Sequence, residues 1–559
     1  MAGVSPSPGG ENVGRYVVRH GGADATERRT LDPEPFLSPL PVARYSIPTM
    51  SDQTEDRRAK LDKIRALGVS PYGGRFVDLT PHERIRAAAE PLEIQPGQIV
   101  EDAGAVFRAA GRVVLHRDIG SLIFMTVRDQ TGDLQYGLSK KMIGDATKWK
   151  VAKLLDLGDI VGVEGRPGRT KTGELTLWCT DITLLSKALR PPPQEWYGLK
   201  DVEARYRRRY VDLFANPPSR EVFLQRARII DYARKVLSER DFVEVETPVL
   251  QPIYGGAAAR PFLTHHNTLD MQLYLRISPE LYLKRCLVGG LDRVYEFSRC
   301  FRNEGISPRH NPEFTMLELY QAYGDYHDMM DICEAVIAGA ARDVIGATTI
   351  QFGEREIDYA TPWTRRKYAD LFAEHVGFPL TDMPSARERA RELRAELPSF
   401  PDEAKLDDAV LISELFEHYV EPHLINPTFV LDYPAPLCPL TKRDPDDPNF
   451  ALRFELYVNG TEVGNAYSEL NDPDVQRETL SSQLRGEEDE TMAVMDEDFV
   501  ESLEYGMPPA GGLGLGIDRI VMLLTGSSSI RDVLLFPLQR PQHSADDRGE
   551  TGSEPEATG

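Results

Sequence analysis

FRNEGISPRHNPEFTMLELYQAY, residues 301–323, is the stretch from which the fold can be predicted. The preceding letters, RVYEFSRC, alternate between two faces and predict a strand that runs into this stretch. The letters after the charged loop alternate again, which predicts a return strand. An antiparallel pair of this kind would gather around one pocket the side chains of Arg302, Glu304, Phe314, Glu318 and Tyr320.

The loop between the two predicted strands carries Arg309 and His310. Cations in this position could bind a polyphosphate that enters the pocket. A second interpretation stays open from the residues alone, namely a solvated hairpin with ordinary surface charges.

Length and charge limit the class of protein. A chain of 559 residues is too long for one ordinary core and predicts two or three domains. The net charge of −23 argues against a nonspecific nucleic-acid binder, which needs a broad basic field. It leaves room for a local basic groove.

Cysteine usage predicts a reducing compartment. The 5 cysteines are scattered, without a CxxC motif or a Cys/His ligand spacing, so neither a disulfide framework nor a structural zinc site is expected. No apolar run approaches the length of a membrane span. We therefore expect a cytoplasmic location and no membrane partner.

The two ends of the chain predict disorder. Residues 1–50 are rich in Gly, Pro and Ser without periodicity, which predicts a disordered extension, and translation from Met50 is an alternative start. Residues 51–103 predict a helix followed by a loop, and residues 541–559 predict a disordered polar tail.

Residues 104–187 change to short strands with Gly-containing turns and a helix-like insert, KWKVAKLLDLG. This pattern is typical of a small Greek-key barrel of the OB type, which commonly stacks a nucleobase on an exposed aromatic ring. Phe124 and Gln135 are the candidates for that contact. Phe124 as an ordinary residue of the barrel core remains the alternative.

A stiff triple proline marks residues 188–205 as a linker, followed by a large domain over residues 206–540. An arginine cluster at this boundary is either a solvated helix face or a contact for a phosphate backbone. It comprises Arg205, Arg207, Arg208 and Arg209. Residues 335–447 predict a helical, loop-rich insertion without chemistry.

RFELYVNGTEVGNAYSEL, residues 453–470, predicts a hairpin that turns at Asn459-Gly460. Glu455 and Glu462 are then diagonal neighbours on one face. Two carboxylates so close need a cation between them, which indicates oxygen-ligated magnesium. Asn465, Tyr467 and Glu469 can line the same pocket only if a bulge interrupts the strand, and Gly464 is its expected place.

Three further segments could border the pocket. GGLGLGIDRIVMLL predicts a glycine-rich strand that a planar ligand can approach, followed by a helix that carries Arg519. GGAAARPF also allows close approach of the backbone to a ligand. In RISPELYLKR, Ser278 caps a helix and Glu280 lies in its first turn, where the helix dipole alone could explain it.

FRNEGISPRHNPEFTMLE and GLGLGIDRIVMLLTGSSSIRDVLLFP resemble motifs 2 and 3 of the class II aminoacyl-tRNA synthetases. GGAAARPFLTHHNTLDMQLYLRISPELYLKR and GNAYSELNDP narrow the resemblance to the bacterial, class IIb lysyl-tRNA synthetase family, from about Asp56 to Arg540. The resemblance implies an α+β protein: an N-terminal OB-type β-barrel that binds the tRNA anticodon, and a large C-terminal domain on an antiparallel β-sheet flanked by helices. It also implies a homodimer.

The same resemblance implies the partners and the role of each site residue. The substrates would be ATP, L-lysine and tRNA(Lys), with Mg²⁺ as cofactor held by Glu455 and Glu462. Arg302 and Arg519 would be the catalytic residues. ATP would be bound by Arg302, Glu304, Arg309, His310, Phe314 and Arg519, and lysine by Gly256, Glu280, Arg302, Tyr320, Asn465, Tyr467 and Glu469.

The implied chemistry is formation of lysyl-adenylate and pyrophosphate, then transfer of lysine to the 3′ end of the tRNA. Such transfer needs positioning and charge stabilisation more than a protein nucleophile. One alternative is a lysyl transferase that acts on a protein such as elongation factor P, although such enzymes resemble the catalytic domain alone. Another is a non-catalytic RNA-binding paralogue, in which Arg302, Glu455 or Arg519 would be expected to be lost.

Overall fold

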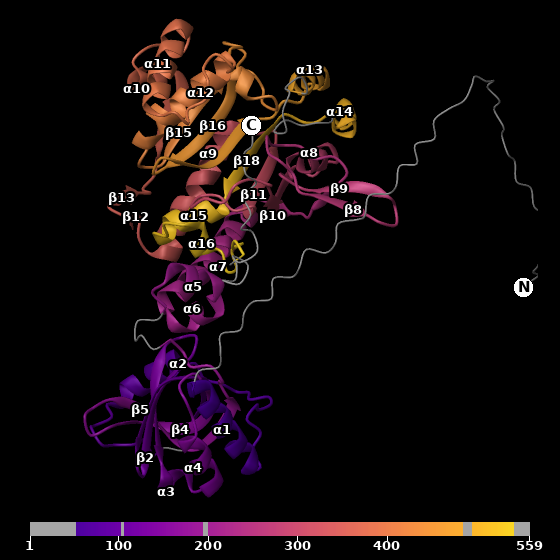
Figure 1. The fold of residues 1–559 in the computed structure, drawn as a ribbon. Helices are drawn as coiled ribbons and strands as arrows, with labels where there is room; N and C mark the ends of the chain where they lie inside the picture. Colours follow the sequence, from indigo (N-terminus) through magenta and orange to yellow (C-terminus); the bar gives the residue numbers. More distant parts are fainter. Residues whose placement is uncertain (1–51, 102–105, 194–198, 484–494, 542–559) are drawn as a thin grey trace, which may run out of the picture. The chain divides into compact units, whose positions relative to one another are not determined.

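The computed structural model describes residues 52–101, 106–193, 199–483 and 495–541 (Figure 1). The predictions made for residues 1–50, for the start at Met50 and for residues 542–559 lie outside these ranges. Among the helices described, none is both long enough and apolar enough to cross a membrane.

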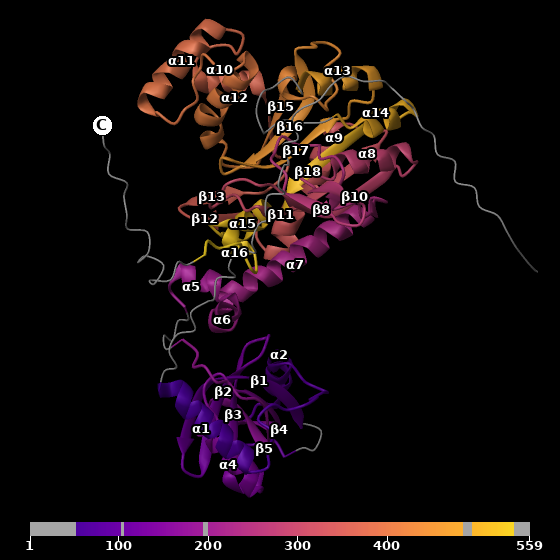
Figure 2. The same ribbon diagram turned by 45° about the vertical axis from the view of Figure 1, so that its right-hand side comes forward.

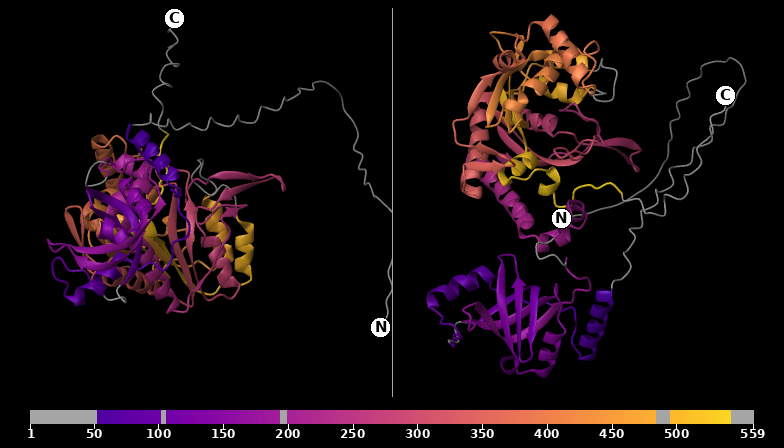
Figure 3. Two further views of the ribbon diagram at one scale, coloured as in Figure 1. Left: turned by 90° about the horizontal axis from the view of Figure 1, so that it is seen from below. Right: turned by 60° about the vertical axis from the view of Figure 1, so that its left-hand side comes forward.

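Five strands form a closed barrel in the order β1-β2-β3-β5-β4. Two short helices, α3 (Lys140–Ile143) and α4 (Ala146–Lys153), separate β3 from β4 as the helix-like insert predicted, and the barrel strands lie beside one another in Figure 3. The strands are β1 (Phe107–Ile119), β2 (Leu122–Arg128), β3 (Asp133–Ser139), β4 (Ile160–Arg169) and β5 (Leu175–Ser186). The OB-type barrel is confirmed.

Helix α1 (Asp52–Ala66) packs on this barrel. Ile64 is fully buried in the barrel core, Arg57 Nη1 donates a 2.8 Å hydrogen bond to Leu157 O, and Lys60 pairs with Asp156 at 2.6 Å. Helix α1 is thus anchored by apolar burial together with charged contacts at the barrel surface. It continues through α2 (His82–Ala89) and η1 (Glu90–Leu92).

The arginine cluster lies on α5 (Val202–Arg207) and α6 (Arg209–Ala215), and it binds protein groups more than solvent. Arg209 is buried and pairs with Asp212 at 2.7 Å, and Arg205 contacts the same carboxylate at 3.0 Å. Arg207 pairs with Glu203 at 2.7 Å. Arg209 therefore cannot contact a phosphate backbone, because it is buried and paired within α6, whereas Arg205 links α5 to Asp212 of α6. Arg208 alone is exposed.

An eight-stranded sheet in the order β14-β15-β16-β17-β18-β11-β10-β6 forms the base of the large domain. The strands from β15 to β10 run antiparallel to their neighbours, as predicted, and a parallel pair closes each edge. Their bounds are β6 (Val243–Glu244), β10 (Arg293–Phe301), β11 (Glu313–Ala322), β14 (Thr364–Lys367), β15 (Thr428–Pro434), β16 (Phe450–Val458), β17 (Thr461–Ser468) and β18 (Ala510–Gly516).

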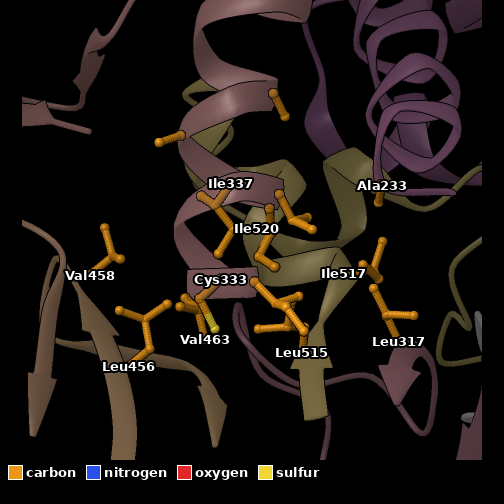
Figure 4. Packing of buried hydrophobic residues seen from close by; sticks show 14 of the residues in the cluster. Ala233, Leu317, Cys333, Ile337, Leu456, Val458, Val463, Leu515, Ile517 and Ile520 are labelled. Atoms are coloured by element: carbon orange, nitrogen blue, oxygen red, sulfur yellow. The ribbon is translucent and has the colours of Figure 1, made fainter. Parts of the chain in front are cut away.

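One face of this sheet carries the main core. Leu317 and Leu319 of β11 are fully buried there against α7 (Pro217–Ser238), α9 (Tyr326–Cys333) and α15 (Ile517–Thr525). Figure 4 shows Leu317, Leu515 and Cys333 within this packing. Figure 2 shows α7 running along the domain beside α15 and α16 (Ile530–Val533). The alternation predicted for β11 is confirmed, so its other face is free to form a site.

The insertion predicted for residues 335–447 contains more than helices. β14 and β15 lie in it and extend the main sheet, because Thr364 to Lys367 pair in parallel with Thr428 to Leu431. α10 (Tyr368–Val376), α11 (Met383–Glu396) and α12 (Asp408–Tyr419) form a separate core against β15 and β16.

The remaining elements are short. They are β7 (Leu250–Gln251), β8 (Leu263–His266), β9 (Met271–Leu275), α8 (Glu280–Val288), η3 (Glu334–Ala338), η4 (Ala341–Ile345), β12 (Thr349–Phe352), β13 (Arg355–Asp358), η5 (Glu421–His423), η6 (Ala435–Leu437), α13 (Pro473–Gln483), α14 (Glu497–Glu504) and α16 (Ile530–Val533).

Candidate active site

A cavity of about 520 Å³ lies over the face of the sheet opposite the main core. Its wall comes from the loop between β10 and β11, from β11, β16, β17 and β18, and from the starts of α8 and α15. A volume of this size is typical of a small-molecule site. The glycine-rich strand β18 forms the floor, where the backbone is bare and a flat ligand can approach.

The cavity brings together nearly all the site residues predicted in the large domain. Those that line it are Gly256, Glu280, Arg302, Glu304, Arg309, His310, Phe314, Tyr320, Glu455, Glu462, Asn465, Tyr467 and Arg519. Glu469 does not reach the cavity surface; it is 1% exposed and lies just behind the wall.

Cations and an aromatic ring gather at the end of the cavity near the β10–β11 loop. The Arg302 guanidinium carbon lies 5.1 Å from the centre of the Phe314 ring. Arg519 Nη1 donates to Glu462 O at 2.7 Å, and its Nη2 lies 3.2 Å from His310 Nε2. Arg302 Nε is buried and has no hydrogen-bond partner within the described part of the chain. This end of the cavity is suited to a ligand that carries both an anionic group and a planar aromatic base.

The surroundings of His310 favour its neutral form. Burial lowers the pKa of its imidazole, and the positive charge of Arg519 lowers it further. Since the Arg519 guanidinium can only donate, His310 Nε2 must accept, and its Nδ1 proton then faces Ser307 Oγ at 2.8 Å. Contact of Arg309 and His310 with a polyphosphate stays a prediction, and a bound polyphosphate would favour protonation of His310.

Carboxylates and hydroxyls gather at the other end. Ser278 Oγ accepts a hydrogen bond from the Glu280 backbone N–H at 3.1 Å and donates to Glu318 Oε1 at 3.0 Å. The Tyr320 hydroxyl donates to Glu318 Oε2 at 3.2 Å, and the Tyr467 hydroxyl donates to Glu280 Oε1 at 2.6 Å. Glu280 therefore has bonding partners beyond the helix dipole.

Glu318 is the buried carboxyl that faces this end of the cavity. Burial raises its pKa to about 8, the charge of Glu280 adds to the shift, and the hydrogen bonds from Ser278 and Tyr320 oppose it. Glu318 is thus mostly protonated at pH 7 while the cavity is empty. A cation bound beside it would favour the ionised form.

Two glycines let the carboxylates approach. A Cβ on Gly512 would lie 2.0 Å from Glu469 Oε1 and 2.5 Å from Tyr320 Cε1, so only glycine admits that carboxylate behind the cavity floor. Gly256 has a φ of +83°, and a Cβ there would lie 3.0 Å from Glu280 Cβ. Glycine at this position therefore lets the backbone pack closely against Glu280 and Ser278.

The predicted hairpin and its bulge are both present. Asn459 and Gly460 have φ values of +53° and +64°, as a tight two-residue turn requires. Tyr457 pairs with Glu462 whereas Leu456 pairs with Gly464, so the extra residue of the bulge is Val463, one position before the expected Gly464. The bulge aligns Asn465 and Tyr467 along the cavity with Glu455 and Glu462, the two hairpin carboxylates.

The two hairpin carboxylates have protein partners of their own. Glu455 Oε1 pairs with Arg453 at 2.5 Å, and its Oε2 accepts from the Tyr457 hydroxyl at 2.6 Å. That hydroxyl also lies 2.9 Å from Glu421 Oε1. Burial raises the pKa of Glu421 to about 7, and the charges of Glu455 and Glu462 contribute.

A divalent cation fits this donor set in part. In the described ranges no three His, Cys, Asp or Glu side chains come together as a complete metal site. Magnesium, however, is usually held by one or two carboxylates, with water and substrate phosphates as the remaining ligands. Glu455 and Glu462 supply such carboxylates on the cavity wall. Burial is the main cause of the raised pKa of the nearby Glu421, and the charges of Glu455 and Glu462 add to it.

On the barrel, Phe124 and Gln135 share the outer surface of β2 and β3. Phe124 is half-buried between the buried Ile123 and Met125, so the alternative of a core phenylalanine is wrong. Its ring packs edge-on against Trp178 at 5.7 Å, and Gln135 donates to Thr176 Oγ1 at 2.7 Å. Trp178 was not predicted as part of this surface.

Known proteins resemble the chain over most of its length. The family model of class II tRNA synthetases (D, K and N) matches residues 201–540, and a model of OB-fold nucleic acid binding domains matches residues 107–185. The lysine–tRNA ligase of Carboxydothermus hydrogenoformans is 48% identical over 499 residues, which is 88% of this chain and 99% of that protein.

Two further relatives agree. The lysine–tRNA ligase of Pelotomaculum thermopropionicum is 48% identical over 87% of this chain and 94% of its own length. That of Bacillus subtilis is 46% identical over 88% of this chain and 98% of its own length. With the barrel, the sheet and the cavity in place, the chain belongs to the lysine–tRNA ligase family of the class II tRNA synthetases.

Proposed function

We propose that the cavity of this lysine–tRNA ligase binds lysine and ATP side by side and joins them as lysyl-adenylate. The position of Arg302 carries this proposal. Its positive charge acts on both His310, at the cationic end, and Glu318, at the carboxylate end. One guanidinium can therefore bind a carboxylate and a phosphate at the junction between two ligands.

In the first half-reaction, an oxygen of the lysine carboxylate attacks the α-phosphorus of ATP, and the bond to the β-phosphate oxygen breaks to release pyrophosphate. Arg302 would hold the attacking carboxylate against the α-phosphate and offset the charge that develops there. Phe314 and Arg519 would hold the adenine, Arg309 and His310 the β- and γ-phosphates, and Glu304 the nucleotide beside them.

In the second half-reaction, a hydroxyl of the terminal ribose of tRNA(Lys) attacks the carbonyl carbon of the adenylate, and AMP leaves. The cavity contributes the same cationic end to the leaving phosphate. Binding of tRNA(Lys) would use the outer surface of the barrel, with Phe124 and Gln135 at the anticodon and Trp178 supporting the Phe124 ring.

The carboxylate end of the cavity would recognise the amino acid. The Gly256 carbonyl and Glu280 would bind the α-ammonium, Asn465 and Tyr467 would line the aliphatic chain, and Tyr320 with Glu469 would meet the ε-ammonium. Glu318 also lines this end, with its hydrogen bond to Tyr320. A lysine ammonium that enters the cavity must lose water, so it needs carboxylates of this kind around it.

We assign Glu455 and Glu462 as the residues that would hold Mg²⁺. A bound Mg²⁺ would supply positive charge that offsets the phosphate charge of ATP. Arg453 and the Tyr457 hydroxyl fix the Glu455 side chain, which keeps its orientation while ATP enters.

We further propose a homodimer in the cytoplasm, in keeping with the resemblance described above. Exposed apolar side chains on and beside β6 and β7 support a second subunit, among them Val243, Val249 and Leu250. The proposed domains are residues 51–103, 104–187, 188–205 and 206–540. Analytical ultracentrifugation of the full chain would test the dimer, which a single monomeric species would contradict.

Charging of tRNA tests the assignment against a transferase that modifies a protein. The barrel matched over residues 107–185 favours a tRNA substrate. Incubation of the full chain with ATP, labelled lysine and bulk tRNA should place lysine on tRNA in an alkali-labile ester. Label that stays on protein, with none on tRNA, would contradict the proposal.

A further inference from the structure

Lys284 is a fully buried lysine beside the carboxylate end of the cavity. It lies on α8, four residues after Glu280, and its side chain is 0% exposed. Its Nζ lies 2.7 Å from Glu280 Oε1 and 2.5 Å from Glu469 Oε2. It also lies 5.4 Å from the centre of the Tyr467 ring. All three partners belong to the proposed lysine site, although Lys284 itself does not line the cavity.

This ammonium remains charged. Burial alone would lower the pKa of Lys284, but the charges of Glu280 and Glu469 outweigh burial and raise it. Burial in turn raises the pKa of Glu469, and Lys284 opposes that shift. The Lys284 ammonium is the buried cation that both carboxylates contact.

The geometry divides the oxygens of each carboxylate between the protein and the cavity. Both hydrogen bonds described for Glu280, from Lys284 and from Tyr467, end on Oε1. Lys284 Nζ lies 2.5 Å from Glu469 Oε2, whereas Glu469 Oε1 lies against Gly512 of the cavity wall; among the described residues neither oxygen has a hydrogen bond of regular geometry. One oxygen of each carboxylate is thereby free of contact with Lys284, and that of Glu469 lies behind the Gly512 backbone.

We propose that Lys284 is a positioning residue of the lysine site. It holds Glu280 on α8 and Glu469 just after β17 in one fixed arrangement, and so orients their remaining oxygens for the substrate. This inference rests on the proposed assignment of Glu280 and Glu469 to lysine. Arg302, Phe314 and Arg519 do not contact Lys284, so ATP binding should be independent of it.

The test compares Lys284→Met, which keeps the packing, with Lys284→Ala, which leaves room for a small amine. In lysine-dependent ATP–pyrophosphate exchange, both variants should raise the lysine KM at least tenfold and change the ATP KM less than twofold. Propylammonium replaces the atoms removed in Lys284→Ala, so it should restore at least part of the lysine affinity. The isosteric alcohol n-propanol should not.

Arg285→Met is the matched control. It removes the neighbouring cation of α8, whose partner Asp496 at 2.7 Å lies outside the cavity, and it should leave both KM values within twofold. Propylammonium should not accelerate the unmodified enzyme. A normal lysine KM in Lys284→Met would overturn the proposal. Equal loss of lysine and ATP affinity would overturn it as well, as would failure of both Lys284 variants to fold.

Glu469→Gln in the same assay separates this inference from the assignment on which it rests. If Glu469→Gln leaves the lysine KM unchanged, the assignment of Glu469 to the lysine site is wrong, and the proposed role of Lys284 is overturned as well. If Glu469→Gln raises the lysine KM while Lys284→Met does not, only the role of Lys284 is overturned. A raised KM in both variants, with rescue of Lys284→Ala by the amine, supports the two together.

Discussion

The Tyr320 hydroxyl donates a hydrogen bond to Glu318 Oε2 at 3.2 Å, across two positions of the same face of β11. Ser278 Oγ donates to the other oxygen of Glu318 at 3.0 Å. Both oxygens of this buried carboxyl are therefore fixed, and Glu318 lines the cavity where a lysine ammonium would bind. Its protonation state should control how tightly lysine is held.

Lysine affinity should rise with pH up to about 8. Burial raises the pKa of Glu318 to about 8, so the carboxyl is mostly neutral below that pH, whereas a bound ammonium requires the ionised form. Binding then releases a proton, and the lysine KM should fall roughly tenfold per pH unit between pH 6 and 8 and level off above. Initial-rate pyrophosphate exchange at fixed, saturating ATP measures this.

Glu318→Gln should remove that pH dependence and leave a lysine KM that is high at every pH. Stability gives an independent check. Because the folded pKa lies above the ordinary value, the stability contribution of Glu318 is present at low pH and is lost as pH rises through about 8. The melting temperature of Glu318→Gln should therefore rise relative to that of the unmodified chain as the pH increases from 6 to 9. A parallel pH course in both proteins would assign the titration to another group.

Glu455→Gln should raise the magnesium concentration needed for adenylate formation while the protein stays folded. The change removes one ligand charge but keeps a side chain that can accept from Tyr457. Magnesium titration of exchange at constant free ATP is the measurement. Glu313→Gln, an exposed carboxylate on the same sheet, serves as control. An unchanged magnesium dependence in Glu455→Gln would make the hairpin carboxylates structural.

Phe124→Ala should weaken aminoacylation of tRNA and spare pyrophosphate exchange, which needs no tRNA. Stacking of a base on an aromatic ring contributes about 1–3 kcal/mol, so the loss in kcat/KM for tRNA should be about tenfold or more. Phe124 is half-buried on the barrel exterior, so truncation leaves the barrel core intact. Equal damage to both reactions would assign Phe124 to stability instead.

Glu469→Gln should cost about 2–5 kcal/mol in lysine-dependent kcat/KM, because it leaves buried cations without their carboxylate. Tyr320→Phe removes only a hydroxyl and should cost less, about 1–3 kcal/mol. The ATP KM should change little in either variant. If Glu469→Gln keeps normal lysine kinetics, or loses as much affinity for ATP as for lysine, the ε-ammonium is bound by Glu318 or another group.

The alternation of side chains made much of this site predictable. Counting by twos from Phe314 to Tyr320 placed the polar face of β11 correctly, and the Asn459-Gly460 turn set the register of the hairpin. The need for both hairpin glutamates and Asn465 to face one pocket predicted the bulge. It falls at Val463 because the ladder slips between Leu456 and Tyr457.

Long-range partners could not be predicted in the same way. In the sequence, Lys284 looks like an ordinary basic residue of an amphipathic helix. Its contact with Glu469 joins positions that are far apart in the chain. Glu421 lies in a segment predicted to lack chemistry, yet it shares the Tyr457 hydroxyl with Glu455. Trp178 is a half-buried strand residue whose contact with Phe124 depends on closure of the barrel.

Activation of lysine through Arg302 is best tested by ATP–pyrophosphate exchange with each of the twenty amino acids in turn. The unmodified chain should show exchange that depends on lysine alone, and Arg302→Ala should abolish it while the protein remains folded, because one guanidinium is needed by both carboxylate and phosphate. Exchange with a different amino acid, or lysine-dependent exchange at a near-normal rate in Arg302→Ala, would contradict the account.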